Sequence, residues 1–399
     1  MKLQATNART LNEALQKSAK CTNTKNANRL LSAVLLTQKP DGSFLFVSST
    51  GDAQLTVPAP LEIVEGQFTQ LLVLPISLIT QLLGTLPPCP ITLDFDDEGK
   101  GKLTMTYCTS VGDSKNERVK EGQMSTTYEN GELFPLLNQP KDELTRMVLP
   151  LACFNEAISR SADFVSRDEF RPALCCMCMQ TADDRSQLDF VACDGNILAR
   201  TIHTNNPKTG GTDFFLSGTP GALLLHRQHF RIFSVFDGED DITIETDRRM
   251  HRFVSGDYEL ICKSIEERYP NYKAIIPLHQ PFHLTFCKKE MLDILKRVSL
   301  CSDKNNQMVK LTVHGMFIDV EASDIDFVRA ASDQVLIEDA KATEGFSMAF
   351  SIPRFTAALQ AIPDESATIY YTDETHAIVV QSPDPAARVL TLCTPCIRF

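Results

Sequence analysis

The sequence predicts an α+β protein built from three similar units, because two patterns recur in each third of the chain. The first is a helical pattern, found as Leu-Asn-Glu-Ala-Leu at 11–15, Phe-Asn-Glu-Ala-Ile at 154–158 and, more loosely, Met-Leu-Asp-Ile-Leu at 291–295. The second is a strand-like run preceded four residues earlier by Pro or Gly, at 91–93, 242–244 and 367–369. Repeats this far apart are domains rather than solenoid modules. We expect domains at 1–143, 144–279 and 280–399.

Each unit is expected to contain an early amphipathic helix, antiparallel strands and a later helix. In the second unit, Phe154, Ile158 and Ala162 lie four residues apart and share one helical face. The later helix, ended by the Pro or Gly, carries apolar anchors at 79 and 82, 230 and 233, and 355 and 358. The strand-like runs lie at 31–37, 44–48, 53–57, 174–179, 188–192, 197–201, 309–313, 316–320 and 327–331. Helices on one side of such strands define an α+β unit.

Two connecting segments carry turn signals. Asp194-Gly195 separates two strand-like runs and predicts a hairpin turn. The segment 110–139 is polar and rich in Gly, Asn and Glu, which predicts an exposed loop.

Composition describes a globular protein without a membrane segment. Hydrophobic residues make up 43% and charged residues 23% of the chain, which is ordinary for a soluble domain protein. The most apolar window, 71–86, is interrupted by Pro75 and Gln81 and is shorter than the roughly 20 residues that span a bilayer. Residues 1–6 lack the apolar core of a secretory signal. We therefore expect a cytoplasmic protein with no membrane partner.

The 13 cysteines favour buried free thiols over disulfides or a metal centre. Most lie in apolar runs such as 174–179, where free Cys behaves as a small hydrophobic residue. Cys393 and Cys396 have the spacing of a redox or zinc half-site, but no second pair with that spacing follows. His226 and His229 are a possible metal pair, although we interpret them as surface histidines. We expect no metal and no cofactor, and keep a redox or metal protein as an alternative hypothesis.

Charge is segregated along the sequence. The net charge is −12, with acidic clusters at predicted turns such as 94–98 and 239–241, whereas Lys and Arg gather in and beside the predicted helices. Such segregation indicates a positive helical face on a negative protein. Scattered solvated cations explain the composition equally well.

The sequence contains no phosphate-binding Gly-x-x-x-x-Gly-Lys-Ser/Thr loop, no His-Glu-x-x-His and no Gly-x-Ser-x-Gly motif. The acid pairs at 96–97 and 240–241 could hold magnesium, but solvation in turns explains them. These observations favour a binding or scaffold protein over an enzyme.

Three motifs in the second unit resemble those of the bacterial sliding clamp, the beta subunit of DNA polymerase III. Residues 192–199, Ala-Cys-Asp-Gly-Asn-Ile-Leu-Ala, resemble its Ala-Thr-Asp-Gly-His-Arg-Leu-Ala signature. Residues 268–277, Arg-Tyr-Pro-Asn-Tyr-Lys-Ala-Ile-Ile-Pro, resemble Arg-Phe-Pro-Asp-Tyr-Arg-x-Val-x-Pro. Residues 169–174 are similar to the family's Glu-x-Arg-Pro-x-Leu. The resemblance covers the whole chain, since the family also has three repeated domains and a similar length.

The resemblance implies a homodimeric, six-domain ring of repeated DNA-clamp domains. In each domain two helices would face the lumen and antiparallel sheets would lie outside. The ring would encircle double-stranded DNA without reading its sequence and would act as a non-catalytic processivity subunit. Implied partners are the DNA polymerase III alpha subunit, the clamp loader, and other polymerases and repair proteins that dock through short peptide motifs.

The resemblance also implies a peptide pocket between domains two and three. Its lining would be Leu174, Cys193, Gly195, Asn196, Ile197, Leu198, Pro270, Ala274, Ile275, Thr394, Pro395, Ile397 and Arg398. The family's Thr, His and Arg are here Cys193, Asn196 and Ile197, which makes the rim less polar. The C-terminal motif is one residue longer than the family's, which leaves the register of its residues open. The alternative is that these residues form only an interdomain seam.

Lys25 lies where the family places a basic loop residue near the lumen. Further lumen candidates are Lys17, Lys20, Arg160, Arg167, Arg171, Arg227, Arg231, Lys296, Arg297 and Arg354. The alternative is that each is an ordinary surface cation. Candidate dimer-interface residues are Leu103, Met105, Tyr107 and Leu300. The competing hypothesis is an interaction hub of the same fold that binds partner peptides without encircling DNA.

Overall fold

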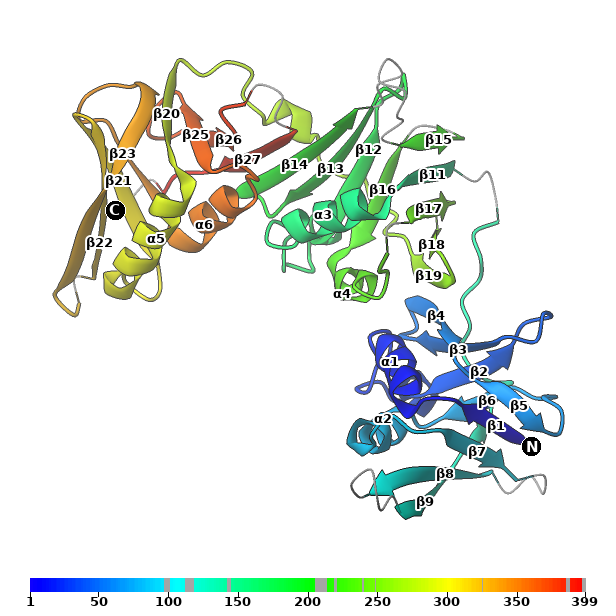
Figure 1. Cartoon of the computed structure of the whole chain (residues 1–399). Coiled ribbons are helices and arrows are strands. Elements are labelled where there is room, and N and C mark those ends of the chain that lie inside the picture. The colour runs from blue at the N-terminus through cyan, green and yellow to red at the C-terminus, as the bar shows by residue number, and fades with distance from the viewer. Residues whose placement is uncertain are drawn as a thin grey trace. The chain divides into compact units, whose positions relative to one another are not determined.

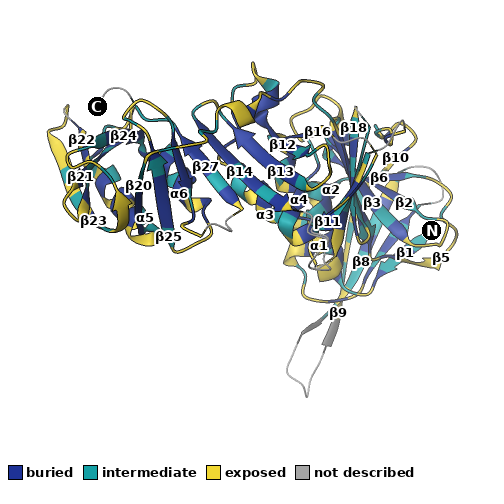
Figure 2. Ribbon diagram, turned by 90° about the horizontal axis from the view of Figure 1, so that it is seen from above, coloured by how far each residue is buried: buried dark blue, intermediate teal, exposed yellow. Residues whose placement is uncertain are grey.

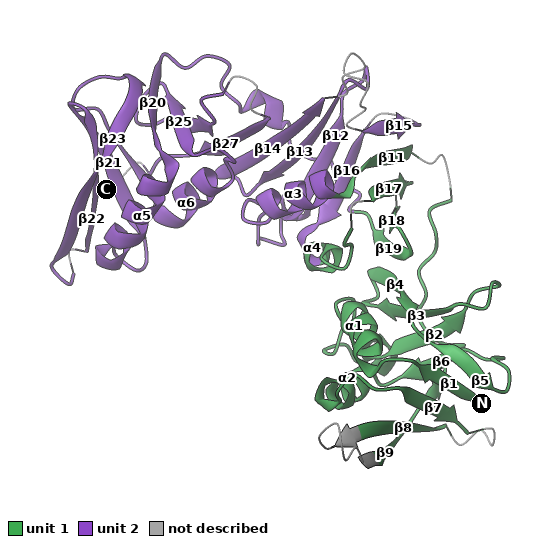
Figure 3. Ribbon diagram, viewed as in Figure 1, with its two compact units in different colours: residues 1–151, 229–264 green, residues 152–228, 265–399 purple. Residues whose placement is uncertain are grey.

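The computed structural model divides into two compact units, which Figure 3 distinguishes by colour and which are described separately. Unit 1 contains residues 1–151 and 229–264, and unit 2 contains residues 152–228 and 265–399. The residues described are 1–96, 101–111, 118–141, 145–204, 214–218, 221–238, 240–247, 249–324, 326–384 and 388–396. Within them, no helix is long and apolar enough to cross a membrane.

In its described residues, unit 1 contains two antiparallel sheets and the three α-helices α1 (Ala8–Ala19), α2 (Ile76–Thr85) and α4 (Phe230–Phe233) (Figure 1). The smaller sheet has the order β5 (Glu62–Glu65), β1 (Lys2–Ala5), β7 (Ile91–Phe95), β8 (Lys102–Val111) and β9 (Arg118–Thr127). The larger sheet has the order β10 (Glu129–Asn130), β6 (Leu72–Leu74), β2 (Val34–Gln38), β3 (Phe44–Ser49), β4 (Ala53–Ala59), β19 (Tyr258–Lys263), β18 (Met250–Ser255), β17 (Asp241–Thr246) and β11 (Thr145–Pro150).

Helix α1 shows how sequence produces these elements. The Asn7 side chain accepts a hydrogen bond from the Arg9 amide at 2.8 Å and caps the helix N-terminus. Leu11, Ala14 and Leu15 fall at helical spacing and are buried, and α1 packs against α2 and against β3 and β4. Strands β4 and β19, about 200 residues apart in sequence, pair directly, with Leu55 opposite Leu260. This pairing is why unit 1 includes residues 229–264.

Unit 2 is built on one continuous antiparallel sheet with the helices α3 (Leu151–Ser161), α5 (Lys288–Val298) and α6 (Ile352–Gln360). The strand order is β16 (Ala222–His226), β12 (Cys176–Thr181), β13 (Gln187–Cys193), β14 (Ile197–Thr204), β27 (Val389–Cys393), β26 (Ile378–Gln381), β25 (Ser366–Tyr371), β20 (Phe282–Cys287), β23 (Arg329–Lys341), β22 (Phe317–Asp324), β21 (Met308–His314) and β24 (Ser347–Ser351). Unit 2 also contains the short strand β15 (Phe215–Ser217) and 3-10 turns at Pro172–Cys175, Tyr272–Ala274 and Ser299–Cys301. A further 3-10 turn, at Arg227–His229, lies where the chain passes from unit 2 to unit 1. Unit 1 has a 3-10 turn at Arg29–Ser32.

The core of unit 2 lies between the sheet and its helices. Figure 2 shows buried residues concentrated in the strands and exposed ones in connections and helix surfaces. Phe286, Ile294 and Phe355 are fully buried, and the rings of Phe350 and Phe355 stack with centroids 5.0 Å apart. Burial of such side chains supplies the main stabilising free energy, roughly 1.5–3 kcal/mol each.

The repeated elements are confirmed, with local corrections. The early helical patterns lie in α1, α3 and α5, and the later anchors lie in α2, α4 and α6, each before a strand. Ala162 lies beyond the end of α3 and is exposed, so it is not part of the buried face. The polar segment 110–139 is not one loop, because 118–127 pairs with β8 as β9. Residues 327 and 328 are not strand: Val328 has a φ of 51° in the β22–β23 turn.

The domain boundaries at 143 and 279 stay predictions. Residue 143 lies outside the described residues.

Candidate peptide and nucleic-acid interfaces

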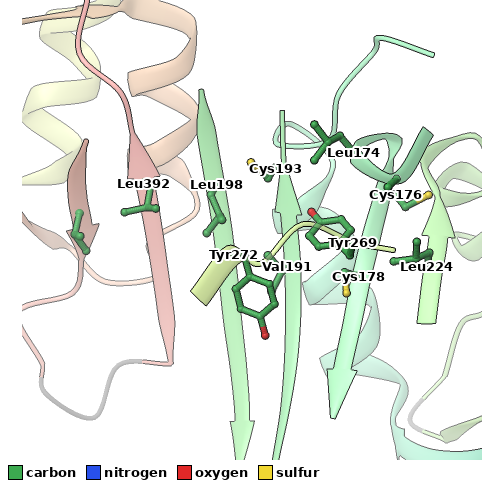
Figure 4. Packing of buried hydrophobic residues seen from close by; sticks show 12 residues of the cluster. Leu174, Cys176, Cys178, Val191, Cys193, Leu198, Leu224, Tyr269, Tyr272 and Leu392 are labelled. Carbon is green, nitrogen blue, oxygen red and sulfur yellow. The ribbon is translucent and has the colours of Figure 1, made fainter. Parts of the chain in front are cut away.

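An apolar cluster in unit 2 brings together part of the predicted pocket (Figure 4). We call it the unit 2 cluster; its buried members are Ala173, Leu174, Cys176, Cys178, Val191, Cys193, Leu198, Leu224, Tyr269, Tyr272, Val379 and Leu392. Leu174, Cys193 and Leu198 were predicted as lining residues. Ile197, also predicted, is 4% exposed. The cluster joins the 3-10 turn at 172–175, strands β12 to β14 and β16, the segment after β19, and strands β26 and β27.

The predicted hairpin turn at Asp194-Gly195 is confirmed. It connects Cys193 and Leu198, which both belong to the unit 2 cluster. The Asp194 carboxylate oxygen Oδ1 accepts hydrogen bonds from the amides of Asn196 and Ile197 at 2.7 and 2.8 Å. Gly195 has a φ of +98°, which side-chain-bearing residues rarely adopt. The turn is therefore fixed by residue types that the sequence alone identifies.

The C-terminal strand lies beside this turn. Strand β27 pairs with β14, with Cys393 opposite Ile197. The Thr394 amide and hydroxyl both donate to the Asn196 carbonyl oxygen, at 2.9 and 3.0 Å. Thr394 and Pro395 are half-buried. The remaining predicted lining residues at this end, Ile397 and Arg398, lie outside the described residues.

The segment 268–277 offers both buried anchors and exposed apolar groups. Pro270 and Ala274 are exposed, and Ile275 is 54% exposed. Tyr269 and Tyr272 are buried in the unit 2 cluster. The segment thus leaves its predicted lining residues accessible while two tyrosines hold it against the sheet.

A buried polar network fixes Tyr272. Its hydroxyl donates to Asp189 Oδ2 at 2.7 Å, and Arg200 donates to the same oxygen at 2.8 Å. Gln187 donates to Asp189 Oδ1 at 2.6 Å. Burial, followed by the Asp189 hydrogen bond, raises the pKa of Tyr272, so the hydroxyl stays a donor at neutral pH. The Asp189 carboxylate is only 1% exposed but fully partnered, which removes most of the cost of burying it.

This network was missed by sequence reasoning. Asp189 on β13 pairs with Ile202, and Arg200 on β14 pairs with Val191, so the two charged residues lie on a diagonal of the sheet. In the sequence they look like ordinary alternating polar positions. A signal was present: Asp189 stands within an otherwise apolar strand. Pairing a charge in such a strand with a cation on the next strand would have found it.

The candidate lumen cations of unit 1 differ in whether they form hydrogen bonds or ion pairs with other side chains. Lys17 on α1 donates to Asp237 Oδ2 at 2.9 Å and to the Tyr258 hydroxyl at 2.8 Å, and its Nζ lies 4.7 Å from the Tyr258 ring centroid. Lys20 donates to the Ser234 hydroxyl at 2.8 Å. Lys25 and Arg231 are exposed, and within the described residues neither has a carboxylate in ion-pair range.

In unit 2, most candidate cations are paired with carboxylates. Arg171 pairs with Asp168 at 2.9 Å, Arg227 with Glu169 at 2.8 Å, Arg297 with Asp333 at 2.6 Å and Arg354 with Asp194 at 3.7 Å, and Arg160 pairs with Glu156. Hydrogen bonds from Arg171, Arg227 and Arg297 lower the pKa values of Asp168, Glu169 and Asp333 respectively. Arg167 and Lys296 are exposed without an ion pair among the described residues.

The candidate interface residues divide into core and surface. The side chains of Leu103 and Met105 are fully buried inside unit 1, and an interface role for their strand stays a prediction. Strand alternation explains this, because residues two apart on β8 point to the same, inner face. Tyr107 is half-buried over Gly122 of β9, and Leu300 is 77% exposed. An interface role for Tyr107 and Leu300 stays a prediction.

The cysteine and histidine expectations are partly confirmed. Cys175, Cys176 and Cys178 are buried free thiols, as predicted for the apolar run. His226 and His229 are not surface residues, since they are 8% and 2% exposed. Glu169, Cys175 and His226 place their possible metal-ligand atoms within 4.8 Å of one another. The spacing of these residues in the sequence did not indicate this group.

Comparison with known proteins agrees with the motif resemblance. Residues 273–393 match the model of the DNA polymerase III beta subunit, C-terminal domain. The beta sliding clamp of Synechocystis is 23% identical to this chain over 88% of both sequences. The beta subunit from the DNA polymerase of Streptococcus pyogenes superposes with a TM-score of 0.84 at 17% identity, over 99% of this chain and all of that one. A Pseudomonas aeruginosa sliding clamp bound to griselimycin superposes with a TM-score of 0.84 at 13% identity, over all of both chains.

Proposed function

We propose that this chain is a member of the DNA polymerase III beta subunit family and a DNA sliding clamp, a ring that encircles duplex DNA and tethers partner proteins. The observation that carries this proposal is the whole-chain likeness to clamp structures, combined with the helix–sheet unit repeated three times. Two copies of a three-domain chain, with boundaries near residues 143 and 279, would close a six-domain ring.

The exposed cations support a sliding rather than a sequence-reading contact. Lys25 and Arg231 in unit 1, and Arg167 and Lys296 in unit 2, can reach phosphates without first breaking an ion pair that the described residues form. Contacts of Lys and Arg with phosphates carry no sequence information. They allow a protein to move along DNA while counterion release supplies the affinity.

Ion pairing makes the proposed DNA contact weak. Six of the eleven candidate cations are neutralised by a carboxylate within 4 Å. Their contribution to the potential at a phosphate is therefore reduced, so retention would rest on ring topology more than on contact energy. The same observation favours the second candidate function, a clamp-fold hub that binds peptides without encircling DNA.

The unit 2 cluster supports a peptide-docking role. Accessible Pro270, Ala274 and Ile275 lie on a segment anchored by two tyrosines that are buried in the same cluster as Cys193. A preformed apolar surface with a few polar backbone groups suits a short peptide with apolar anchors. The griselimycin-bound Pseudomonas aeruginosa clamp is an instance of a protein of this fold with a bound ligand. We propose that the polymerase alpha subunit, the clamp loader, and other polymerases and repair proteins dock here, and that the chain itself is a non-catalytic cytoplasmic subunit.

The experiment that tests the DNA function is topological retention. The chain would be loaded by its own clamp loader onto nicked circular DNA, passed through a sizing column at high salt, and then treated with a nuclease that linearises the circle. We expect co-elution with circular DNA and release after linearisation. Loss of binding at high salt before linearisation would contradict encirclement and favour the hub.

A charge variant separates the two candidate functions further. Lys25, Arg167, Arg231 and Lys296 would be replaced by Ala together, with Lys2→Ala as the control because Lys2 pairs with Glu65 on the small sheet of unit 1. The salt dependence of DNA binding should fall by about one unit of slope for each phosphate that a removed cation had neutralised. Peptide binding should not change. An unchanged slope in the fourfold variant would remove these residues from the DNA interface.

A further inference from the structure

We propose that Glu169, Cys175 and His226 form a divalent transition-metal site, with zinc as the metal that their ligand chemistry fits best. A glutamate oxygen, a cysteine sulfur and a histidine nitrogen lie within 4.8 Å of one another. Zinc is held by this mixture of sulfur, nitrogen and oxygen ligands in tetrahedral sites. With three protein ligands, the fourth position would hold water.

Two ligands lie on rigid, neighbouring elements. Cys175 ends the 3-10 turn that leads into β12, and His226 ends β16. These strands pair, with Cys176 opposite His226, so the sheet itself places Cys175 beside the imidazole. Cys175 is fully buried and His226 is 8% exposed, which fixes their positions by packing. A site on strand ends needs little rearrangement to bind.

The third ligand comes from a hydrogen-bonded loop that opens to solvent. The Asp168 side chain accepts from the Phe170 amide at 3.1 Å and from Arg171 at 2.9 Å, which holds the loop on either side of Glu169. The Glu169 side chain is 61% exposed. A metal ion can therefore reach the two buried ligands along the glutamate side.

The distance between two of the ligand atoms matches a shared zinc ion. His226 Nε2 and Glu169 Oε2 are 3.5 Å apart. That is longer than an ordinary N–H···O hydrogen bond, which measures about 2.7–3.2 Å. Oxygen and nitrogen ligands at about 2.0–2.2 Å from zinc, at the tetrahedral angle, lie about 3.4 Å from each other. Glu169 Oε1 remains bonded to Arg227 at 2.8 Å, so the two carboxylate oxygens have separate roles.

Metal binding has a defined proton balance. The Cys175 thiol now donates to the Asp168 carbonyl at 3.3 Å, and it would release its proton to solvent on coordination. His226 Nδ1 accepts from the Gln228 amide at 3.4 Å. Coordination through Nε2 places the ring proton on Nδ1, so this long hydrogen bond would be given up. Both hydrogen bonds are weak, and giving them up costs little beside what a metal–thiolate bond contributes.

The test uses the full chain after removal of metal with a chelator. Zinc would be titrated in competition with a chromogenic chelator, and cobalt would be added separately because cobalt–thiolate coordination gives a characteristic charge-transfer absorption. We expect one equivalent bound tightly, with the thiolate band. Cys175→Ser should abolish the band. Mutating a residue that only hydrogen-bonds to a metal ligand weakens metal binding by up to about 100-fold. Replacing the ligand itself, in His226→Gln, should therefore weaken zinc binding at least about 100-fold.

Matched controls keep the test decisive. Cys287→Ser removes a half-buried thiol elsewhere in unit 2 and should leave the band and the stoichiometry unchanged. Glu169→Gln changes an exposed side chain and should weaken zinc binding with the fold intact, as judged by circular dichroism. Absence of the thiolate band in the unmodified chain would overturn the proposal. A band that survives Cys175→Ser would overturn it as well, because another cysteine would then hold the metal.

Discussion

Replacing Tyr272 with Phe removes one hydroxyl from a buried network and changes little else. The hydrogen bond that disappears, 2.7 Å long, goes to the Asp189 carboxylate. Hydrogen bonds to charged groups contribute about 1.5–3 kcal/mol. Asp189 keeps its hydrogen bonds from Arg200 at 2.8 Å and from Gln187 at 2.6 Å. We therefore expect the local stability to fall by an amount near the lower end of this range, about 2 kcal/mol.

The appropriate assay is native-state hydrogen exchange of the segment 268–277, since this segment is what the hydroxyl anchors. A loss of about 2 kcal/mol in local opening free energy corresponds to roughly 30-fold faster amide exchange. If the pocket assignment holds, peptide affinity should fall as well, because part of the binding free energy then orders the segment.

Tyr370→Phe is the matched control. Tyr370 packs beside the same cluster but is half-buried, and its hydroxyl makes no hydrogen bond within the described part of the chain. It should leave exchange in 268–277 unchanged. If Tyr272→Phe changed exchange by less than threefold, the network would not position this segment and the reasoning would be refuted.

Three further predictions concern charge, thiols and backbone. Asp237→Asn should free Lys17 and steepen the salt dependence of DNA binding by about 0.9 in slope; a filter-binding series with an unchanged slope would place Lys17 away from phosphate. Burial raises the pKa of Cys178 to about 12, so at pH 8 only about one thiol in 10⁴ is ionised. Iodoacetamide should therefore label exposed Cys108 and spare Cys178 until the protein is denatured, and mass spectrometry showing the reverse would contradict the assigned burial. Gly195→Ala should cost about 1–3 kcal/mol at its φ of +98° and weaken peptide binding; urea unfolding equal to that of the unmodified chain would show that the turn relaxes freely.

Local rules predicted the repeated helices, most strands and the Asp194-Gly195 turn, because each depends on residues close in sequence. Helical spacing found Leu11, Ala14 and Leu15, and turn chemistry found Gly195. The β4–β19 pairing could not be predicted in this way, since its partners are about 200 residues apart.

The unit 2 cluster was only partly predicted for the same reason. Motif positions identified Leu174, Cys193 and Leu198, whereas the tyrosine anchors and Asp189 depend on which strand lies beside which. The Glu169, Cys175 and His226 group was missed because strand pairing, and not sequence spacing, brings Cys175 to His226. Leu103 and Met105 were proposed as interface residues by their position in the family, and that position did not reveal that their side chains are buried.

The central claim is that two copies of this chain close a ring, and native mass by light scattering across a concentration series tests it most directly. We expect a species near twice 44.4 kDa, about 89 kDa, that persists on dilution to the concentration used for DNA loading. A mass of 44.4 kDa at every concentration would contradict a self-closed ring and would leave the peptide-binding hub as the function of this chain.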